Sequence, residues 1–468
     1  MNMEMGISDK TYLYNLIAKL CSHVTRTLTK NYLVRYSCIS EEERQRVNTR
    51  IEKETPFVLG SKGKFCPIAE ADIDEEYVKK LAGFSDLLKI ADDKNCIMRF
   101  LQALDESLAE VLIEERKRLQ NGRVTRGLNS NRKETGIAIL PKCECVWARK
   151  SRESFSYRRI DNYLKHLMII EDRVLEDVED RHIFIPKGFF PNFDATSQMK
   201  IAATPLNAKS SFDIRYHRND DLQVFSLDYH ESAAARDNER VWEKIVQAGA
   251  EGAELIAFPE MLGNATMEYA ICRKLKNLSE QERDQIPPMI VLPSYFSGTQ
   301  NFSSILDRAG NVLARQFKQN PYVLKTRHGD FMENIDGSNE IYIFHYEGIG
   351  RFAVLICKDF LTTKHMERIM RGFMLTLIIV PAYSTGSYDF KMSFDLCAHD
   401  YCNVVWINSC AAMIPGKESN FAFIGYVRKR INRYQDESES MSEMKPCDGL
   451  LNGKCDGKCI YYDHFGTV

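Results

Sequence analysis

The sequence lacks any long apolar run. None of its 468 residues belongs to an uninterrupted apolar stretch of the roughly 18 residues that cross a bilayer. Its start, MNMEMGISDKTYLYN, lacks the basic region followed by an apolar segment that marks a secretory signal. These two absences argue against a membrane-spanning or exported chain. They predict a cytoplasmic protein without membrane contact.

Net charge is nearly absent as well. The 63 Lys and Arg residues oppose 65 Asp and Glu residues, so no global field draws the chain towards nucleic acid or a membrane surface. Cysteine is sparse for a disulfide scaffold, with 14 in the chain. Cys96, Cys272 and Cys410 each lie inside apolar segments. We therefore expect reduced thiols that mostly serve packing.

Nucleotide-binding signals are missing too. The sequence has no Gly-x-x-x-x-Gly-Lys loop of the kind that cradles phosphate. It also has no synthetase segment that would consume released ammonia. We therefore expect no cofactor.

The length of the chain predicts at least two domains, because a single core seldom exceeds about 200 residues. Apolar residues recur at helical spacing from Cys96 to Arg118 and again from Ile160 to Val178. The first part is therefore predicted to be mainly helical. Segment 121–136, rich in Gly, Asn and Arg, is typical of an exposed flexible loop, and segment 189–213 of a loose connector.

Three regions are predicted: a helical accessory domain over residues 1–215, an α/β domain over 216–435, and a Cys- and Gly-rich tail over 436–468. From Leu222 onward, short apolar runs alternate with helical segments, which is typical of an α/β fold. LQVFSLDY, the helix after it and ELIAFPE form a strand-helix-strand unit, whose strands should be parallel. Further strands are expected in MIVLPSYF, FSSILDRAGNVLARQF, EIYIFHY, GRFAVLIC, LTLIIVP and NVVWIN.

Three chemically active residues each close an apolar strand: Glu260 in ELIAFPE, Lys318 after VLARQF and Cys357 in RFAVLIC. Strand ends fix a side chain while the following loop leaves room for substrate. A thiol is mostly neutral at pH 7, so a nucleophilic cysteine needs a base for its proton and a cation near the developing charge. Glu260 and Lys318 supply these groups. Each residue alone also fits a structural role, as a loop carboxylate, a surface lysine or a buried thiol.

The order Glu, Lys, Cys resembles the nitrilase superfamily of carbon–nitrogen hydrolases. GAELIAFPEMLG, NVLARQFKQNPY and GRFAVLICKDF are similar to its three motifs, and RGFMLTLIIVPAYS to the strand and loop after the cysteine. The resemblance covers about residues 222–430 and implies a four-layer αββα sandwich, here preceded by the helical domain. It also implies Glu260 as general base, Lys318 as stabiliser of the tetrahedral intermediate and Cys357 as the nucleophile that forms a thioester.

Two further site residues follow from the resemblance. The family often has a second glutamate after the lysine; Glu333 in GDFMENIDG is the best match, Glu340 competes with it, and an ordinary loop carboxylate is the alternative for either. The backbone amide of Lys358 is expected beside Lys318 in the oxyanion hole, because the turn after a nucleophile fixes the direction of that amide.

Lys358 itself departs from the family, in which this residue is commonly aromatic or acidic. Its side chain would favour the thiolate, bind an acidic substrate, or act only as a solvated turn residue. Nitrile-cleaving members of the family usually carry tryptophan here, so its absence favours amides over nitriles.

The predicted function is therefore hydrolysis of a non-peptide carbon–nitrogen bond, in a small-molecule amide, through a thioester on Cys357. The alternative is a catalytically silent nitrilase-like scaffold that binds a partner, although the retention of all three residue types argues against it. Nucleic-acid binding would depend on cations between Arg116 and Lys133. Neighbouring Glu114 and Glu115 favour a solvated helix end and loop instead.

The resemblance also implies a homodimer or larger homo-oligomer formed by helices beside the cysteine. The candidates are Lys364–Arg371 and Phe390–Tyr401; burial of the second segment within the chain is the competing explanation of its apolar residues. The region 1–215 is expected to gate the site or recruit a protein partner, with a passive cap as the alternative.

The tail contains a candidate set of zinc ligands, Cys447, Cys455, Cys459 and His464. Their spacing fits no common finger and includes no Cys-x-x-Cys pair. Unpaired thiols in a glycine-rich hairpin are the favoured interpretation, so no metal is predicted.

Overall fold

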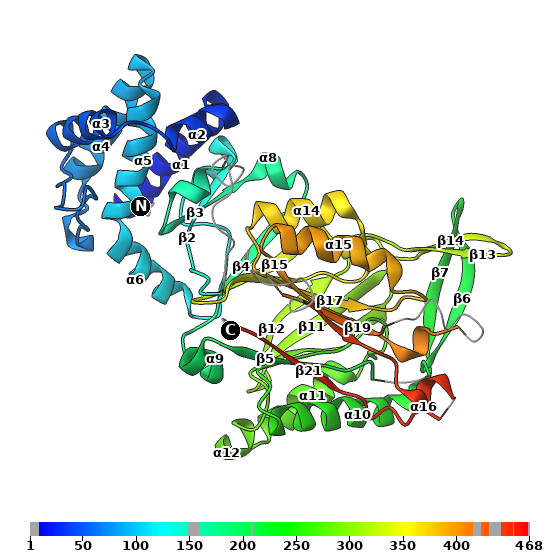
Figure 1. The fold of residues 1–468 in the computed structure, drawn as a ribbon. Coiled ribbons are helices and arrows are strands. Elements are labelled where there is room, and N and C mark those ends of the chain that lie inside the picture. Colours follow the sequence, from blue (N-terminus) through cyan, green and yellow to red (C-terminus); the bar gives the residue numbers. More distant parts are fainter. Residues whose placement is uncertain are drawn as a thin grey trace, which may run out of the picture. The chain divides into compact units, whose positions relative to one another are not determined.

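A computed structural model describes residues 9–147, 159–206, 209–414, 423–429, 441–452 and 454–466. The chain forms two compact units, which can be followed by colour along the sequence in Figure 1. The first comprises the described residues within 1–143, 151–176 and 182–184, and the second those within 144–150, 177–181 and 185–468. Among the described residues, no helix is both long and apolar enough to cross a membrane.

The first unit is mainly helical, as predicted. Thr29, Ser40, Asp74 and Asp93 each precede a helix and accept a hydrogen bond from a backbone N–H of its first turn. These caps satisfy donors that have no partner inside the helix. The elements are α1 (Asp9–Thr27), α2 (Lys30–Tyr36), α3 (Glu41–Glu54), η1 (Glu70–Asp72), α4 (Glu75–Ala91), α5 (Lys94–Ser107), α6 (Ala109–Leu119), β1 (Val124–Thr125), α7 (Arg132–Thr135), β2 (Ile137–Pro141), η3 (Ile160–Tyr163), β3 (Leu167–Glu171) and α8 (Asp172–Leu175). Strand β4 (Glu179–Phe184) is divided between the two units.

The predicted helix from Ile160 to Val178 is wrong. The segment instead forms the short helix η3, strand β3 and the single turn α8. Strand β3 pairs antiparallel with β2, with Ile169 opposite Ile139. Four successive buried residues begin β3, and one face of a surface helix cannot bury four in a row. The helical spacing of the apolar residues was therefore coincidental.

The predicted exposed loop over 121–136 is only partly right, because residues 121–124 are exposed but the segment also contains β1 and α7 and buries two asparagines. Asn129 and Asn131 are 9% and 8% exposed. The Asn129 side chain donates to the carbonyl of Ile137 at 2.9 Å and accepts from the N–H of Ile139 at 2.9 Å. Asn131 donates to the carbonyl of Asn15 on α1 at 3.0 Å. Side-chain amides thus satisfy backbone groups where no regular ladder forms.

The second unit contains β-sheets flanked by helices. Its elements are α9 (Pro191–Thr196), β5 (Met199–Ala203), β6 (Phe212–Asn219), β7 (Leu222–Tyr229), α10 (Glu231–Ala250), β8 (Leu255–Ala257), α11 (Met267–Lys276), α12 (Glu280–Arg283), β9 (Met289–Val291), β10 (Tyr295–Ser297), β11 (Gln300–Asp307), β12 (Val312–Phe317), β13 (Val323–Thr326), β14 (Gly329–Glu333), β15 (Glu340–Tyr346), β16 (Gly350–Val354), α13 (Lys358–Leu361), α14 (Thr363–Gly372), β17 (Leu377–Ala382), α15 (Tyr388–His399), β18 (Asn403–Asn408), η4 (Cys410–Ala412), β19 (Gly425–Arg428), β20 (Met441–Met444), α16 (Asp448–Leu451) and β21 (Tyr461–Phe465).

Two large sheets form the middle of this unit. One has the order β15-β16-β17-β18-β19-β20, and the other β10-β11-β9-β8-β5-β21 with β12 paired to β11. The side chain of Gln316 on β12 joins them, because it donates to the carbonyl of Glu340 and accepts from the N–H of Tyr342, both at 3.0 Å. Helices α14 and α15 cover the first sheet, and α10 and α11 cover the second (Figure 1). The four-layer αββα order is confirmed.

The predicted pairing of the strand-helix-strand unit is wrong. Strand β7 belongs to a separate sheet of order β13-β14-β7-β6, whereas β8 is parallel to β5 and β9. Strand β5 comes from the segment predicted to be a loose connector, which also contains α9. A strand of five residues with four buried side chains left no alternating pattern to detect.

The structure also corrects the predicted domain boundaries at residues 215 and 435. Strand β5 lies before residue 215, yet it pairs with β8 of the second unit. Strand β21, in the predicted tail, pairs antiparallel with β5 on its other side. The tail thus completes a sheet that begins before the predicted α/β domain, while residues 436–440 lie outside the described part of the chain.

Removing residues 1–215 is expected to leave an aggregating protein. The truncation deletes β5, whose Ile201 is fully buried, and exposes the facing edges of β8 and β21. A chain that begins at Asp177 keeps β5 and serves as the control. Size-exclusion chromatography and thermal melting compare the two. A monodisperse, cooperatively melting 216–468 fragment would contradict this expectation.

The apolar segment Phe390–Tyr401 is explained largely within the chain. Phe390 and Phe394 on α15 are fully buried, and Phe390 packs on Trp406 with ring centroids 4.8 Å apart. These residues therefore require no partner. Self-association stays a proposal, for which Tyr388 and Met392 on α15, 78% and 77% exposed, are candidate contact residues. A monomer by light scattering at micromolar concentration would count against it.

Candidate active site

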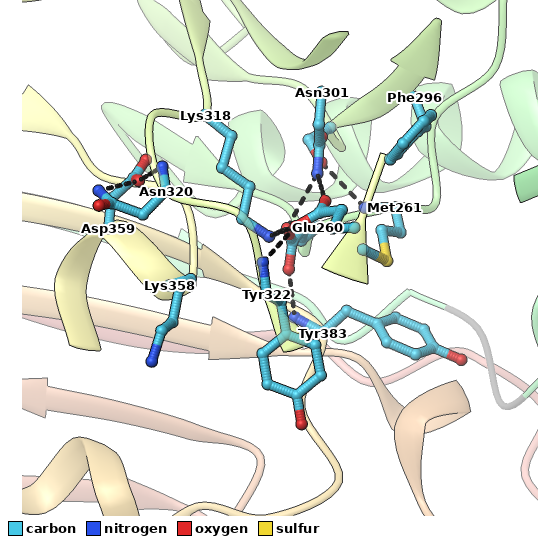
Figure 2. Close-up of polar contacts among 12 residues, drawn as sticks. Glu260, Met261, Phe296, Asn301, Lys318, Asn320, Tyr322, Lys358, Asp359 and Tyr383 are labelled. Carbon is cyan, nitrogen blue, oxygen red and sulfur yellow. Dashed lines mark hydrogen bonds and ion pairs between the residues drawn. The ribbon is translucent and has the colours of Figure 1, made fainter. Parts of the chain in front are cut away.

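Four strand ends of the second unit bring the predicted site residues together. Glu260 follows β8, Lys318 follows β12, Glu333 is the last residue of β14, and Cys357 follows β16. The first three side chains are fully buried or nearly so, and Cys357 is 5% exposed. Residues separated by about a hundred positions in the sequence therefore meet in one interior cluster, part of which is drawn in Figure 2.

Lys318 lies at the centre of this cluster. Its Nζ is 2.8 Å from Oε1 of Glu260 and 2.6 Å from Oε2 of Glu333, and all three side chains have no exposed surface. Attraction between unlike charges is much stronger in such an interior than in water. A single ammonium thus holds two carboxylates that would otherwise repel each other.

Asn301 on β11 contacts the same two carboxylates, at the Glu260 oxygen that Lys318 also contacts and at the Glu333 oxygen that Lys318 does not contact. Its Nδ2 donates to Oε1 of Glu260 and to Oε1 of Glu333, each at 3.0 Å (Figure 2). The Oγ of Ser294 donates to Oδ1 of Asn301 at 2.7 Å, which sets the orientation of the amide. The positions of both carboxylates therefore depend on side chains other than the triad.

Two backbone amides complete the binding of the carboxylates. The N–H of Tyr383, just after β17, donates to Oε2 of Glu260 at 3.1 Å, and the N–H of Tyr322 donates to Oε2 of Glu333 at 3.0 Å. Each glutamate thus accepts bonds from a lysine, an asparagine and a main-chain amide. Such bonds restrict each carboxylate to one orientation.

Cys357 occupies a strained backbone position. Its φ of 45° lies in the left-handed region, which non-glycine residues seldom adopt, and its ψ is −95°. It forms the N-cap of the short helix α13, so the chain turns sharply directly after β16. The Glu260 carboxylate and the Tyr383 N–H both lie close enough to the thiol to shift its pKa. The turn therefore presents the sulfur to the base.

Burial, with the charge of Glu260, raises the pKa of the Cys357 thiol and keeps it neutral at rest. Burial raises the pKa of Cys357 well above its ordinary value, Glu260 raises it further, and Lys318 opposes both. Burial also raises the pKa of Glu260, against the lowering effect of Lys318. For Lys318, burial opposes the charge, but the carboxylates outweigh it and hold its pKa well above the ordinary value. Ionisation of the thiol therefore requires a base in contact with it.

Asp359 links the lysine loop to the cysteine turn. Its carboxyl accepts the N–H of Gln319 at 3.0 Å, the N–H of Asn320 at 2.7 Å and the Nδ2 of Asn320 at 2.9 Å (Figure 2). Burial raises the pKa of Asp359 to about 7, although these hydrogen bonds oppose the rise. The positions of Lys318 and Cys357 are thereby coupled.

The structure separates the two candidates for the second glutamate. Glu333 joins the cluster, whereas the partly exposed Glu340 at the start of β15 pairs with Arg181. Lys358 begins α13 beside the nucleophile and is partly buried. Its side chain points to the same side as that of Tyr322 in Figure 2.

Asn301, Asp359 and the Tyr383 amide were missed in the sequence. Asn301 and Asp359 carried a signal, since each is a polar residue inside or directly after an apolar strand. Their partners lie 32 to 41 positions away and could not be assigned from spacing.

The tail cysteines do approach one another. Cys447 lies within hydrogen-bonding reach of Cys455 and Cys459, whereas the His464 ring faces Asp463, with Nδ1 3.9 Å from Oδ1. In the described ranges, no group of three or more Cys, His, Asp or Glu side chains is arranged to hold a metal ion.

Several cations of the suggested nucleic-acid patch are paired with acidic residues. Lys117 pairs with Glu114 at 2.6 Å, Arg118 with Glu115 at 2.8 Å and with Glu70 at 2.7 Å, and Arg132 with Asp172 at 2.6 Å. These pairs fit the solvated helix end and loop.

Known proteins resemble the chain only at the level of structure. No protein-family model matches the sequence, and no curated protein matches it. One similar structure is that of an amidase from Nesterenkonia sp. AN1, a C145A mutant in complex with butyramide. The similarity covers 57% of this chain and 91% of the amidase, with a TM-score of 0.36 and 15% sequence identity. Nit3 of Saccharomyces cerevisiae, a member of branch 10 of the nitrilase superfamily, is similar over 57% of this chain and 90% of its own, with a TM-score of 0.33 and 13% identity.

A glutamine-dependent NAD+ synthetase from Acinetobacter baumannii is also similar, with a TM-score of 0.36, 14% identity and 57% of this chain covered. The similarity covers 45% of the synthetase, and 61% of the C. elegans NitFhit protein, so the chain matches about half the length of these two proteins. At these identities and TM-scores, the chemistry of the site has to follow from its own geometry.

Proposed function

We propose that this protein hydrolyses the carbon–nitrogen bond of a small non-peptide amide through a thioester on Cys357. The observation that carries the proposal is the buried Lys318, which contacts Glu260 and Glu333 beside a thiol at a strained turn. Buried charges are costly, and apolar residues of similar volume would stabilise a fold at least as well. A cluster of this kind supports a chemical role.

The proposed reaction begins at the contact between Cys357 and Glu260. Glu260 takes the thiol proton, and the sulfur attacks the amide carbon to give a tetrahedral intermediate. The intermediate collapses as Glu260 returns the proton to the leaving amine, which leaves a thioester. Water then attacks the thioester, with Glu260 again as base, and the acid and the free thiol are released.

Lys318 and the N–H of Lys358 are assigned to the negative oxygen of the intermediate. Lys318 Nζ already lies beside Glu260, and the Lys358 amide opens α13, where the helix supplies it with no acceptor. Glu333 then acts as a positioning residue, because its contact at 2.6 Å holds the ammonium in place. Ammonia release from a panel of small amides, by the wild type and by Cys357→Ser, tests this function.

A catalytically silent scaffold is the second candidate, favoured by one observation. The Cys357 side chain is only 5% exposed, so a substrate has little access to it in this conformation. Iodoacetamide labelling followed by peptide mapping separates the two candidates. A thiol that stays unmodified in the folded protein, while exposed Cys38 and Cys66 react, would favour the scaffold.

The charge of Lys358 predicts a preference for acidic reagents at Cys357. Among the described residues no ion pair involves its ammonium, and it is the neighbour of the nucleophile. We expect Lys358→Gln to slow alkylation of Cys357 by iodoacetate several-fold more than alkylation by neutral iodoacetamide. The ratio of the two rates cancels any change in thiol ionisation. An unchanged ratio would identify Lys358 as a solvated turn residue.

A further inference from the structure

The helical first unit contains a polar cavity of about 470 Å³ that the hydrolase chemistry does not use. Small-molecule sites commonly enclose roughly 300–1,000 Å³. The walls come from α2, α3, α5, the turn before α4 and the segment at η3, all of which belong to the first unit. The cavity is therefore large enough for a metabolite and independent of the second unit.

Arg99 on α5 holds one wall of the cavity in place. Its Nη1 and Nη2 contact the two Glu106 oxygens at 3.2 and 3.0 Å, and its Nε donates to Asn48 at 2.6 Å. Nη2 also donates to the carbonyl of Gly63 at 3.0 Å. The guanidinium is 4% exposed overall and its charge is balanced by Glu106. It anchors the turn that contains Gly63.

That turn presents two lysines to the cavity. Lys62 and Lys64 flank Gly63, whose φ of 69° permits the tight bend, and the N–H of Gly60 donates to the carbonyl of Lys64 at 2.7 Å. Within the described ranges, neither ammonium forms an ion pair, and both lysines are exposed residues that line the cavity. Like charges held on one short turn repel each other, and a bound anion would relieve this repulsion.

The rest of the lining includes one cation, Arg44, one further carboxylate, Glu41, and two aromatic rings. Arg44 has only a distant acidic neighbour, Glu41, at 3.8 Å. Tyr36 and Tyr163 meet edge to face with ring centroids 5.5 Å apart, and the Tyr36 hydroxyl is fixed by Gln102 at 2.7 Å. The cavity thus has an excess of positive charge at its lysine turn. Its two aromatic rings, Tyr36 and Tyr163, are held by contact with each other.

We propose that this cavity binds a small phosphate-bearing molecule, with the phosphate at Lys62, Lys64 and Arg44. A phosphate group accepts several charge-assisted hydrogen bonds at once, which suits three cations that are not fully neutralised. The sequence has no glycine-rich phosphate loop, but side-chain cations serve the same anion without one.

Isothermal titration of the full chain tests this proposal with pyrophosphate, ATP and adenosine as probes. We expect saturable binding of pyrophosphate or ATP that weakens with salt, and none of adenosine. If only pyrophosphate binds, the site takes an inorganic anion; if ATP binds more tightly, the aromatic walls contribute. The Lys62→Ala/Lys64→Ala double variant should weaken binding at least about tenfold.

Lys79→Ala/Lys80→Ala is the matched control, since these exposed lysines on α4 already pair with Glu75 and Glu76 at 2.6 and 2.9 Å. This variant should bind like the wild type. Circular dichroism checks that both variants keep their helices. The proposal is overturned if neither anion binds saturably, if adenosine binds as well as ATP, or if the Lys62/Lys64 variant retains wild-type affinity.

Discussion

Cys357→Ser is expected to reduce hydrolysis of any amide that the wild type cleaves by on the order of 10⁴-fold or more. A hydroxyl is far harder to ionise than a thiol, and burial already raises the pKa of the Cys357 thiol well above its ordinary value. Glu260 can remove the proton of the thiol but is too weak a base for the hydroxyl of serine. Serine is nearly isosteric, so the fold should remain.

The matched control for this variant is Cys272→Ser. Cys272 is a buried cysteine on the helix α11 and is not among the residues that contact Glu260, Lys318 or Glu333. Its substitution should leave the rate close to that of the wild type. Initial rates of ammonia release measure the catalytic activity of both variants, and thermal unfolding measures their stability. Substantial hydrolysis by Cys357→Ser would mean that Cys357 is a packing residue and not the nucleophile.

Lys318→Met is expected to lower the free energy of unfolding by about 3–5 kcal/mol as well as to abolish turnover, since breaking a buried ion pair leaves uncompensated charge. Lys318 neutralises two carboxylates that have no exposed surface. The complete burial of Lys318 is the reason to expect a loss of stability as well as of activity.

The destabilisation of Lys318→Met should depend on pH. Lys318 lowers the pKa of Glu260, so its removal raises that pKa further above the unfolded value. The folded variant then binds more protons than the unfolded chain, and its stability falls as pH rises above about 4. Urea unfolding at pH 5 and pH 8 measures the free energy of unfolding of the variant and so its dependence on pH. Adding Glu333→Gln should restore part of the stability, and equal losses for the single and double variants would contradict the account.

The strand ends of the site were predictable because each combines two local signals. An apolar run followed directly by Glu260, Lys318 or Cys357 identifies both the strand and the side chain that leaves it. Glu333 was harder to assign, since Glu340 lies only seven residues away and both are ordinary loop or strand-end carboxylates in the sequence. Only the fold shows that Glu333 ends β14 beside Lys318, while Glu340 pairs with Arg181.

The missed features depend on contacts between distant segments. Strand β5 is recognisable only because β8 and β21 flank it, and β21 is more than 250 residues away. Asn129 and Asn131 look like loop residues until the carbonyls and amides that they satisfy are known. Local periodicity contains no information about such partners. It therefore put the domain boundaries at the wrong residues and did not reveal the buried contacts of the segment 121–136.

The central claim is that Cys357 forms a thioester, and mass spectrometry tests it most directly. The full-length protein is incubated with a panel of small amides or a metabolite extract, quenched in acid and mapped by peptides. The account predicts an added acyl mass on the Cys357 peptide that neutral hydroxylamine removes and that Cys357→Ser lacks. An acyl adduct confined to another cysteine, or ammonia release without any adduct on Cys357, would contradict it.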